Sequence, residues 1–515
     1  MLNRRTNRKW MLLLIAVLLV ITTACGNSNP GSSETSGSNS GSQSSTPAPA
    51  ESTEPAEPIE LSIMTILFEP TAPTPEMPSL VRLQELTNTK LDVTFVPSQV
   101  FPDKVNATIA SGEMSDLLLV TDLKSSSVVN AVRSGMFWEL GPYFSEYPNL
   151  SKLNPLILNN SSIDGKTYAL YRSREWVLAR GGIIYRKDWL ENVGLQPPKT
   201  IDELYQVFKA FTEQDPDGNG KHDTYGAGET NFITMNTIAP YFGVPNLWDV
   251  QDGKFVPDFM TSEYMELLKF MKRLYDEKLI NQDFAAAGLL HHDHLNMGKS
   301  GLAFGTMDDI TNQYNEIYSL FPDAELGLIN RISGPKGERV YASAGFNGAF
   351  MVPKTSVKTE ERLREVLQYL DASLSEEVMD FFTWGIDGRH SKVEDGAPVV
   401  HDQDLYNLEM QPIRQLMSGN QAIARPGKRL PLAMEALEKI DDNASIAIAN
   451  PATPLISETH VERGGELQKL IDDAKVKFIM GQIDEAGWQA SVDNWLKTGG
   501  SNIIDEYTKA YADSQ

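Results

Sequence analysis

The sequence is short of cysteine, of positive charge and of recognisable catalytic motifs. One cysteine in 515 residues excludes an intramolecular disulfide. Acidic residues outnumber basic ones by 69 to 45, which gives a formal net charge of −24. Because no basic patch stands out, we do not expect nucleic acid as a partner. The sequence also contains no nucleophile elbow, Walker loop or zinc-protease motif.

A long apolar run occurs only near the N-terminus, at residues 10–21, after four basic residues within 4–9. This is the layout of a signal peptide, and the run is too short for a comfortable membrane span. The residues that end in Cys25 resemble a lipobox, in which the cysteine is lipidated, although Thr22 stands where Leu or Val is commoner. We therefore predict a lipoprotein signal peptide at 1–24 and a lipid anchor on Cys25. An ordinary secretory signal with a chance cysteine, or an uncleaved anchor helix, are the alternatives.

The segment that follows lacks every residue type that builds a core. Residues 26–57 contain no aromatic and no large aliphatic side chain. Such a segment cannot bury enough apolar surface to order itself. We predict that residues 25–57 are a disordered tether between the lipid anchor and a globular body.

Strand and helix patterns alternate from residue 61 onward. Strand patterns occupy 61–67, 91–96 and 116–120, and helix patterns occupy 78–89 and 102–111 between them. This order predicts an α/β fold with a parallel sheet and right-handed crossovers. Ligands bind at the carboxyl ends of the strands in such sheets. Thr121 and Asp122 fall at such an end and are therefore candidate ligand contacts.

A second unit is predicted to begin near Gly181. Thr200 and Glu203 have the spacing of a capping box at the start of a long amphipathic helix. The other elements predicted after residue 181 are a strand at 182–185 and helices at 188–194, 262–278, 360–373, 375–383 and across 466–513.

One short acidic loop has the ligand spacing of an EF-hand-type calcium loop. Positions 1, 3, 5 and 9 carry the oxygen-bearing side chains of Asp215, Asp217, Asn219 and Asp223. Position 6 is a glycine, and Lys221 can offer its backbone carbonyl from position 7. Position 12 is Gly226, where a bidentate Glu is usual, and only one helix clearly flanks the loop. We therefore predict a lone structural calcium site; the alternative is an acidic turn without metal.

Several segments carry a family resemblance, and they occur in the family's order. They are 165–170 with 184–190, then 192–204, 298–304, 385–390 with 394–396, and the stretch from 478–481 through Trp488 to 507–511. Together they resemble extracellular solute-binding protein family 1, the maltose-binding type of ABC-transporter receptor. The large Gram-positive lipoprotein subgroup, similar to the alginate-binding proteins, fits best and shares the calcium-like loop.

The resemblance implies a type II periplasmic-binding-protein-like fold, with two α/β lobes that are joined by several crossovers and close over ligand. It also implies a carbohydrate ligand, delivery to an ABC-transporter permease and a monomer held at the outer face of the cell membrane. The lobes are then expected to divide as 58–180 (lobe 1), 181–342 (lobe 2), 343–385 (return to lobe 1) and 386–515 (completion of lobe 2 and C-terminal helices).

A sugar site needs flat aromatic rings for the sugar faces and planar polar groups for the hydroxyls. Trp176, Trp248 and Trp384 lie in irregular segments near the expected lobe junctions. The candidate ligand contacts beside them are Arg174, Glu175, Asp387, Arg389 and Asp308. The alternatives are a surface ion pair around Trp176, a purely hinge-shaping role around Trp384, and a plain loop at Asp308. Trp189, Trp488 and Trp495 follow helical patterns and are expected in the core.

The histidines at 291–294 are not expected to bind a transition metal. Neighbouring histidines cannot all face one ion on a regular element, and no cysteine or distant ligand set supports them. A solvated loop is the expected structure there.

Together these features favour a substrate-binding lipoprotein of an ABC importer that captures a carbohydrate, with calcium as a structural ion. Two alternatives stay open. One is a receptor for a peptide or other small solute, and the other is a secreted carbohydrate-active enzyme, which would need two carboxylates at a set separation. We expect that Trp176→Ala or Trp384→Ala weakens binding without unfolding the body.

Overall fold

The computed structural model describes residues 57–514 except 176–177 and 287–288. The first sheet has the strand order β2-β1-β3-β14-β4. Its strands are β1 (Ile59–Leu67), β2 (Thr89–Pro97), β3 (Leu117–Val120), β4 (Ala169–Ser173) and β14 (Phe346–Met351). β1 is parallel to β2 and β3, as the alternating pattern predicted, whereas β14 is antiparallel to β3 and β4. All four residues of β3 are buried, as its all-apolar sequence predicted.

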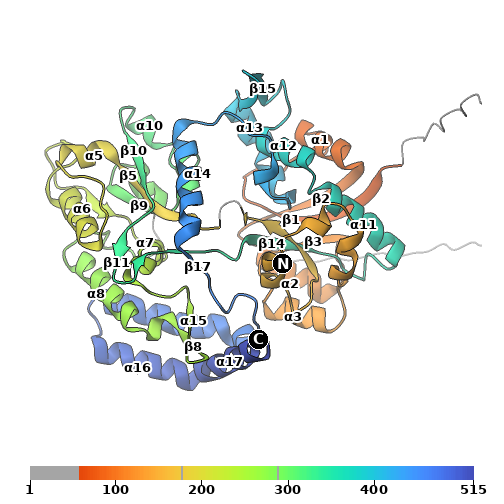
Figure 1. Ribbon diagram of the computed structural model, residues 1–515. Coiled ribbons are helices and arrows are strands. Elements are labelled where there is room, and N and C mark those ends of the chain that lie inside the picture. Colours follow the sequence, from red (N-terminus) through yellow and green to blue (C-terminus); the bar gives the residue numbers. More distant parts are fainter. Residues whose placement is uncertain (1–56, 176–177, 287–288, 515) are drawn as a thin grey trace, which may run out of the picture. The chain divides into compact units, whose positions relative to one another are not determined.

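Helices around the first sheet complete one hydrophobic core. They are α1 (Pro78–Thr87), α2 (Phe101–Ser111), α3 (Ser126–Arg133), α4 (Pro155–Asn160), α11 (Glu360–Ala372), α12 (Glu376–Trp384) and α13 (Gln403–Met410). In Figure 1, α1 to α3 and α11 to α13 lie around β1, β2 and β3, although α11 to α13 come more than 200 residues later in the chain. This first lobe is therefore built from segments far apart in sequence.

The second sheet has the order β10-β5-β9-β6 and its own core. Its strands are β5 (Gly181–Arg186), β6 (Tyr225–Ala227), β9 (Ser300–Thr306) and β10 (Leu326–Ile329). Its helices are α5 (Lys187–Asn192), α6 (Ile201–Glu213), α7 (Ile233–Ile238), α8 (Ser262–Asp276), α9 (His291–Asn296) and α10 (Ile317–Leu320). The predicted N-cap of α6 is confirmed, because the Thr200 hydroxyl accepts the Glu203 N–H at 3.2 Å. The Glu203 carboxylate, however, accepts from the N–H of Lys199 and not from that of Thr200.

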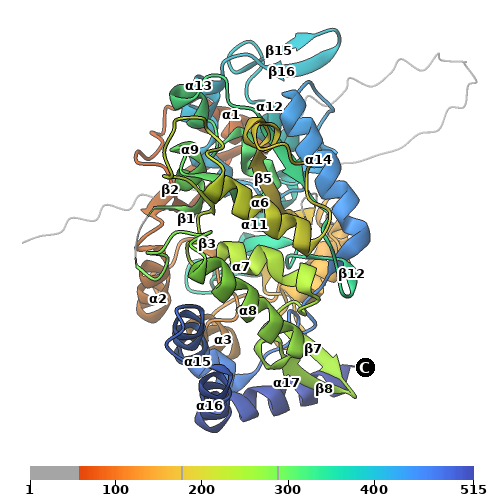
Figure 2. The same ribbon diagram turned by 90° about the vertical axis from the view of Figure 1, so that its left-hand side faces the viewer.

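Three long C-terminal helices cover the second lobe: α15 (Glu458–Ile479), α16 (Glu485–Trp495) and α17 (Ser501–Ser514). Figure 2 shows them beside α8 and the hairpin of β7 (Trp248–Gln251) and β8 (Lys254–Pro257). Trp488 and Trp495 are each 3% exposed within this core and Trp189 is 1% exposed, so their predicted core positions are confirmed. No helix in the described part of the chain is long and apolar enough to cross a membrane.

Short two-stranded pairings complete the elements. They are β11 (Ser333–Gly334) with β12 (Gly337–Glu338), β13 (Val340–Tyr341) with β17 (Ala447–Ile448), and β15 (Ser391–Glu394) with β16 (Ala397–Val400).

The segment after α12 departs from the expected lobe division. We expected residues 386–515 to complete the second lobe, but five apolar residues between 406 and 417 are buried in the first core. They are Tyr406, Met410, Ile413, Leu416 and Met417. The chain joins the second lobe only with α14 (Pro431–Asn443), whose Ala436 and Ile440 pack beside β10. An amphipathic helix alone does not reveal which of two similar apolar surfaces it will cover.

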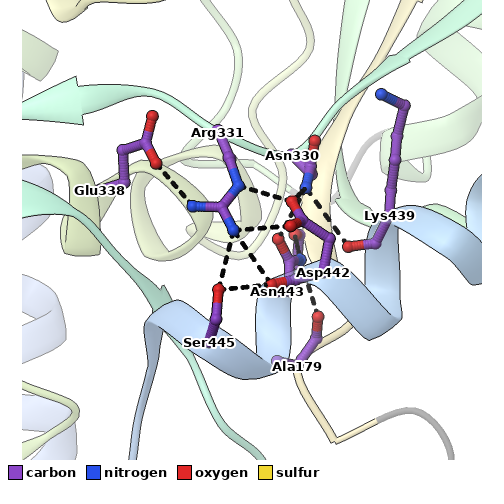
Figure 3. Close-up of polar contacts among 9 residues, drawn as sticks. Ala179, Asn330, Arg331, Glu338, Lys439, Asp442, Asn443 and Ser445 are labelled. Atoms are coloured by element: carbon purple, nitrogen blue, oxygen red, sulfur yellow. Dashed lines mark hydrogen bonds and ion pairs between the residues drawn. The ribbon is translucent and has the colours of Figure 1, made fainter.

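The C-terminal end of α14 binds two of the crossovers between the lobes (Figure 3). The Asn443 amide, fully buried, donates to the carbonyls of Ala179 and Gly181 at 2.8 and 3.0 Å. Next to it, Arg331 pairs with Asp442 at 2.5 Å and with Glu338 at 2.6 Å. One helix end thus fixes both the crossover from β4 to β5 and the one from β10 to β14.

Candidate ligand-binding site

A cavity of about 790 Å³ lies where the crossovers meet. One side is formed by first-lobe residues of the β4–β5 crossover, the end of α12 and the turn after α13. The other side is formed by the segment 308–315 after β9 and by α14. This volume lies within the range of cavities that hold small ligands, about 300–1,000 Å³. The cavity is therefore the candidate site, and it lies at the junction of the two lobes.

Asp308, a predicted contact, lines this cavity in a bidentate ion pair with Arg180. The guanidinium donates to the two carboxylate oxygens at 2.7 and 2.6 Å. Burial disfavours the charge of Arg180, but Asp308 and Asp309 more than offset this, so the pKa of Arg180 is raised. Burial raises the pKa of Asp309, which also accepts a short hydrogen bond from Thr306. This end of the site therefore presents a fixed pair of opposite charges that can donate to and accept from hydroxyls.

Arg174, also predicted, lines the cavity without a carboxylate partner among the described residues. Its guanidinium donates a hydrogen bond to the carbonyl of Ser173 at 3.2 Å. Burial lowers the pKa of Arg174, and the charges of Arg414 and Arg180 lower it further, while the charge of Asp308 offsets part of this effect. Arg414 lines the same cavity and donates to Gln421 at 3.1 Å.

Trp384 lies at the cavity too, but most of its ring is covered. It is 3% exposed, its indole N–H donates to the carbonyl of Arg425 at 3.0 Å, and the Arg429 guanidinium stands 5.1 Å from the ring centre. Gly427 packs so closely on the ring that a Cβ there would lie 2.4 Å from it. Only part of the indole can therefore meet a ligand.

Other predicted contacts lie elsewhere. Trp248 packs on Phe255 and Tyr507 in the second core, with ring centres 5.9 and 5.1 Å away, beside a separate cavity of about 300 Å³. Asp122 is exposed and accepts the N–H of Lys124. We had placed Trp248 at a lobe junction because its flanks look irregular, but those flanks lead into the β7–β8 hairpin.

The segment 385–390 forms a structural turn and does not line the cavity. Asp387 is exposed, and Arg389 forms a bidentate pair with Glu409. His390, fully buried, accepts the Ile386 N–H and lies 3.0 Å from the same Glu409 carboxylate. The hinge-shaping alternative therefore describes Asp387 and Arg389 better than ligand contact does.

The remaining residues predicted to have a function are Glu175, Trp176 and Cys25. Glu175 does not line the cavity and accepts hydrogen bonds from Tyr171 and Asn154 at 3.1 and 3.2 Å. Trp176 and Cys25 lie outside the described residues.

The sequence did not point to several residues that line the cavity. They include Arg180, Asn312, Gln313, Asn347, Arg414, Gln415 and Arg429. Arg180 lies two residues before the predicted strand at 182–185, so its place at a crossover gave a usable signal. Arg414 and Gln415 gave no such signal, because the sequence predicts that their segment belongs to the other lobe.

The histidines at 291–294 lie on α9 and not in the expected solvated loop. His294 is 3% exposed and forms a short hydrogen bond with the Tyr225 hydroxyl. Among the described residues, no group of three or more His, Cys, Asp and Glu side chains is arranged to hold a metal ion. His294 packs against Tyr225 of β6, whereas the ring of His292 lies against that of Tyr314.

The calcium-like loop is ordered by its own side chains. The Asp215 carboxylate accepts the N–H groups of Asn219 and Gly220 at 3.1 and 3.0 Å. The Asn219 amide donates to Asp217 and Asp223 at 2.7 and 3.1 Å. Burial and the nearby carboxyls of Asp215 and Asp223 raise the pKa of Asp217. These oxygens are of the hard type that calcium prefers, so the donor chemistry fits, and Asn219 links the carboxylates.

Two α/β lobes that are joined by several crossovers around a ligand-sized cavity define a two-lobed solute-binding protein. The chain belongs to the bacterial extracellular solute-binding protein family, whose model matches residues 72–380. It is 40% identical to the polygalacturonan/rhamnogalacturonan-binding protein YtcQ of Bacillus subtilis, over 98% of this chain and 99% of that protein. It is 35% identical to lipoprotein LipO of the same organism, over 99% of each chain.

Solved structures share the fold at low identity. A solute-binding protein of Bifidobacterium longum infantis associated with an HMO-binding ABC transporter has a TM-score of 0.70 at 19% identity, over 88% of this chain and 98% of that one. The alginate-binding protein AlgQ2, solved without calcium ion, has a TM-score of 0.68 at 16% identity, over 89% and 99%. An EF-hand mutant of FusA from S. pneumoniae, bound to fructo-nystose, has 0.63 at 20% identity, over 88% and 99%. These likenesses establish the two-lobed fold.

Proposed function

We propose that this protein is the substrate-binding lipoprotein of an ABC importer and captures an oligosaccharide between its lobes. The cavity at the lobe junction carries the proposal, because it combines amides, the Arg180–Asp308 pair and part of the Trp384 ring. Such groups match the hydroxyls and apolar faces of sugars. The relative at 40% identity is named for binding a polysaccharide, which supports the same ligand class.

A thermal-shift and calorimetric screen of the full-length protein against oligosaccharides tests this proposal. A ligand that binds only the folded state raises the melting temperature by mass action. We expect saturable binding of at least one oligosaccharide and none of a peptide library. Binding of peptides alone would instead support the receptor for a different solute.

We infer that the protein binds its sugar without cleaving it. Among the described residues, the carboxylates that line the cavity are Asp308 and Asp309, which are neighbours on one side and do not face each other across it. Incubation of the bound oligosaccharide with the protein, followed by chromatography, should return it intact. Glycosidic cleavage would overturn the receptor function.

We also propose that calcium occupies the loop at 215–223 as a structural ion. Asp215, Asp217, Asn219 and Asp223 would hold it with the Lys221 carbonyl. A cation there would screen the carboxyl repulsion that raises the pKa of Asp217. A solved neighbour, FusA, is described as having an EF-hand. Asp215→Ala should therefore lower the melting temperature in calcium more than in chelator.

Asp252→Ala is the matched control for that substitution. Asp215 and Asp252 both lie in turns at positive φ, 48° and 51°, so both variants meet the same backbone cost. The difference between them isolates the calcium-dependent part. If the melting temperature of the wild type is the same in calcium and in chelator, the proposal of a calcium site is wrong.

A further inference from the structure

The charges that line the cavity do not balance. Among the described residues, five cationic side chains line it (Arg174, Arg180, Arg414, Lys428 and Arg429) against two carboxylates, Asp308 and Asp309. This is opposite to the chain as a whole, which carries a formal net charge of −24. The positive excess is therefore a local property of the site.

Two of the five cations are already neutralised. Both carboxylates of the cavity face Arg180, at 2.6 Å for Asp308 and 3.6 Å for Asp309. Lys428 pairs with Asp395 at 2.6 Å, outside the cavity. Arg174, Arg414 and Arg429 are left, and none of them has a carboxylate within 4.0 Å in the described part of the chain.

A fourth arginine behind the cavity wall adds to this positive charge. Arg172 is 2% exposed, and its guanidinium donates to the carbonyls of Met417, Asn347 and Arg414 and to the amide of Gln415. None of these partners carries a negative charge. Burial lowers the pKa of Arg172, and Arg174 and Arg414 lower it further, yet an arginine stays charged at neutral pH.

Arg172 is buried, and Arg174 and Arg414 are half-buried. Gathering like charges that are partly withdrawn from water costs free energy unless a counter-charge completes the group. Apart from the two carboxylates that face Arg180, the described part of the protein supplies no carboxylate to these arginines, so further negative charge is expected from the ligand. Guanidinium groups bind carboxylates bidentately through their planar fork. The amides and the Arg180–Asp308 pair in the same cavity remain for hydroxyl groups.

We propose that the ligand is an acidic oligosaccharide, made at least partly of uronic acid units, with carboxylates held by Arg174, Arg414 and Arg429. This inference rests on the proposed capture of an oligosaccharide and names its chemical class. Arg180 and Asp308 then position the sugar through its hydroxyls. Arg172 is a positioning residue, since it holds the 414–417 backbone that carries Arg414.

Calorimetric titration of the full-length protein with trigalacturonic acid and with its methyl ester tests the proposal. The ester keeps the shape of the sugar and removes its charges. We expect the acid to bind at least about 10-fold more tightly than the ester, with a preference that shrinks as salt rises. Arg174→Gln and Arg414→Gln should each weaken acid binding about 10- to 100-fold and change ester binding little.

Arg82→Gln is the matched control, because Arg82 is a surface residue of α1 paired with Glu85 and loses the same charge. Arg429→Gln serves as a third site variant, since that side chain is exposed and its loss does not threaten folding. Equal affinity for acid and ester, or unchanged acid binding in all three site variants, would overturn the acidic class. Neutral oligosaccharides that bind in that case would leave the proposed function intact, whereas no binding of any saccharide would overturn the function itself.

Discussion

Single buried residues decide how stability depends on pH, and Glu229 is the clearest case. It is fully buried, and its carboxylate accepts the N–H groups of Thr234 and Met235 at the start of α7. Burial nevertheless raises the pKa of Glu229 to about 7. A carboxyl whose pKa is raised on folding binds more protons in the folded state than in the unfolded one.

The stability that Glu229 contributes is therefore fully present below about pH 4.5 and is lost as the pH rises toward 7. We expect Glu229→Gln to remove about 1–3 kcal/mol of this decline in the free energy of unfolding. Urea denaturation at pH 5 and pH 7.5 measures it, with Glu213→Gln on the exposed end of α6 as the control. Identical pH slopes in the wild type and Glu229→Gln would contradict the expectation.

The burial of Trp384 makes substitutions at this position affect stability as well as ligand binding. Because it is 3% exposed, Trp384→Ala should lower the free energy of unfolding by about 3–5 kcal/mol. This expected loss of stability replaces the expectation from the sequence that Trp384→Ala weakens binding without unfolding the protein. Trp384→Phe keeps a ring and loses the bond to the Arg425 carbonyl, at a cost of about 1 kcal/mol. Urea denaturation and saccharide titration of both variants separate stability from affinity.

At the scale of elements, the end of α14 is the point where three parts of the chain meet. Asn443 bonds to the β4–β5 crossover and lies 3.2 Å from the amide of Asn330, at the end of β10. Asn443→Ala would leave the carbonyls of Ala179 and Gly181 buried without a donor. We expect a loss of about 1–3 kcal/mol in the free energy of unfolding.

Asn494→Ala, on the exposed face of α16, is the matched control and should change stability by less than about 0.5 kcal/mol. Chemical denaturation compares the two variants. A loss of the same size in both would show that Asn443 does not hold the crossovers.

At the scale of the whole molecule, the lipid anchor predicted at Cys25 would keep the binding lobes near a membrane transporter. We predict that Cys25→Ser prevents lipidation, because the hydroxyl cannot replace the thiol at this position. In cells, the variant should move from the membrane fraction to the medium, with unchanged affinity for saccharide. Retention in the membrane fraction would favour the uncleaved anchor helix.

Much of the molecule can be predicted from local sequence, since local patterns report local structure. The all-apolar β3, the cap of α6 and the core tryptophans of α5 and α16 are all visible as spacing and composition. The sequence also pointed to Arg174 and Asp308, which line the cavity: Arg174 directly follows β4, and Asp308 lies two residues after the end of β9.

The sequence by itself determined the class of protein, through alternating strands and helices and a series of family-like segments. Only the tertiary structure decided which lobe receives α13 and the turn at 412–417, and with it the place of Arg414. It also decided that Arg389 serves a turn while Arg174 and Arg414 face the cavity without counter-charges. The hydrogen bonds from Arg172 to the carbonyls of Arg414 and Met417 join residues more than 200 positions apart. The free energy that selects such long-range contacts comes from packing and desolvation, which no local pattern encodes.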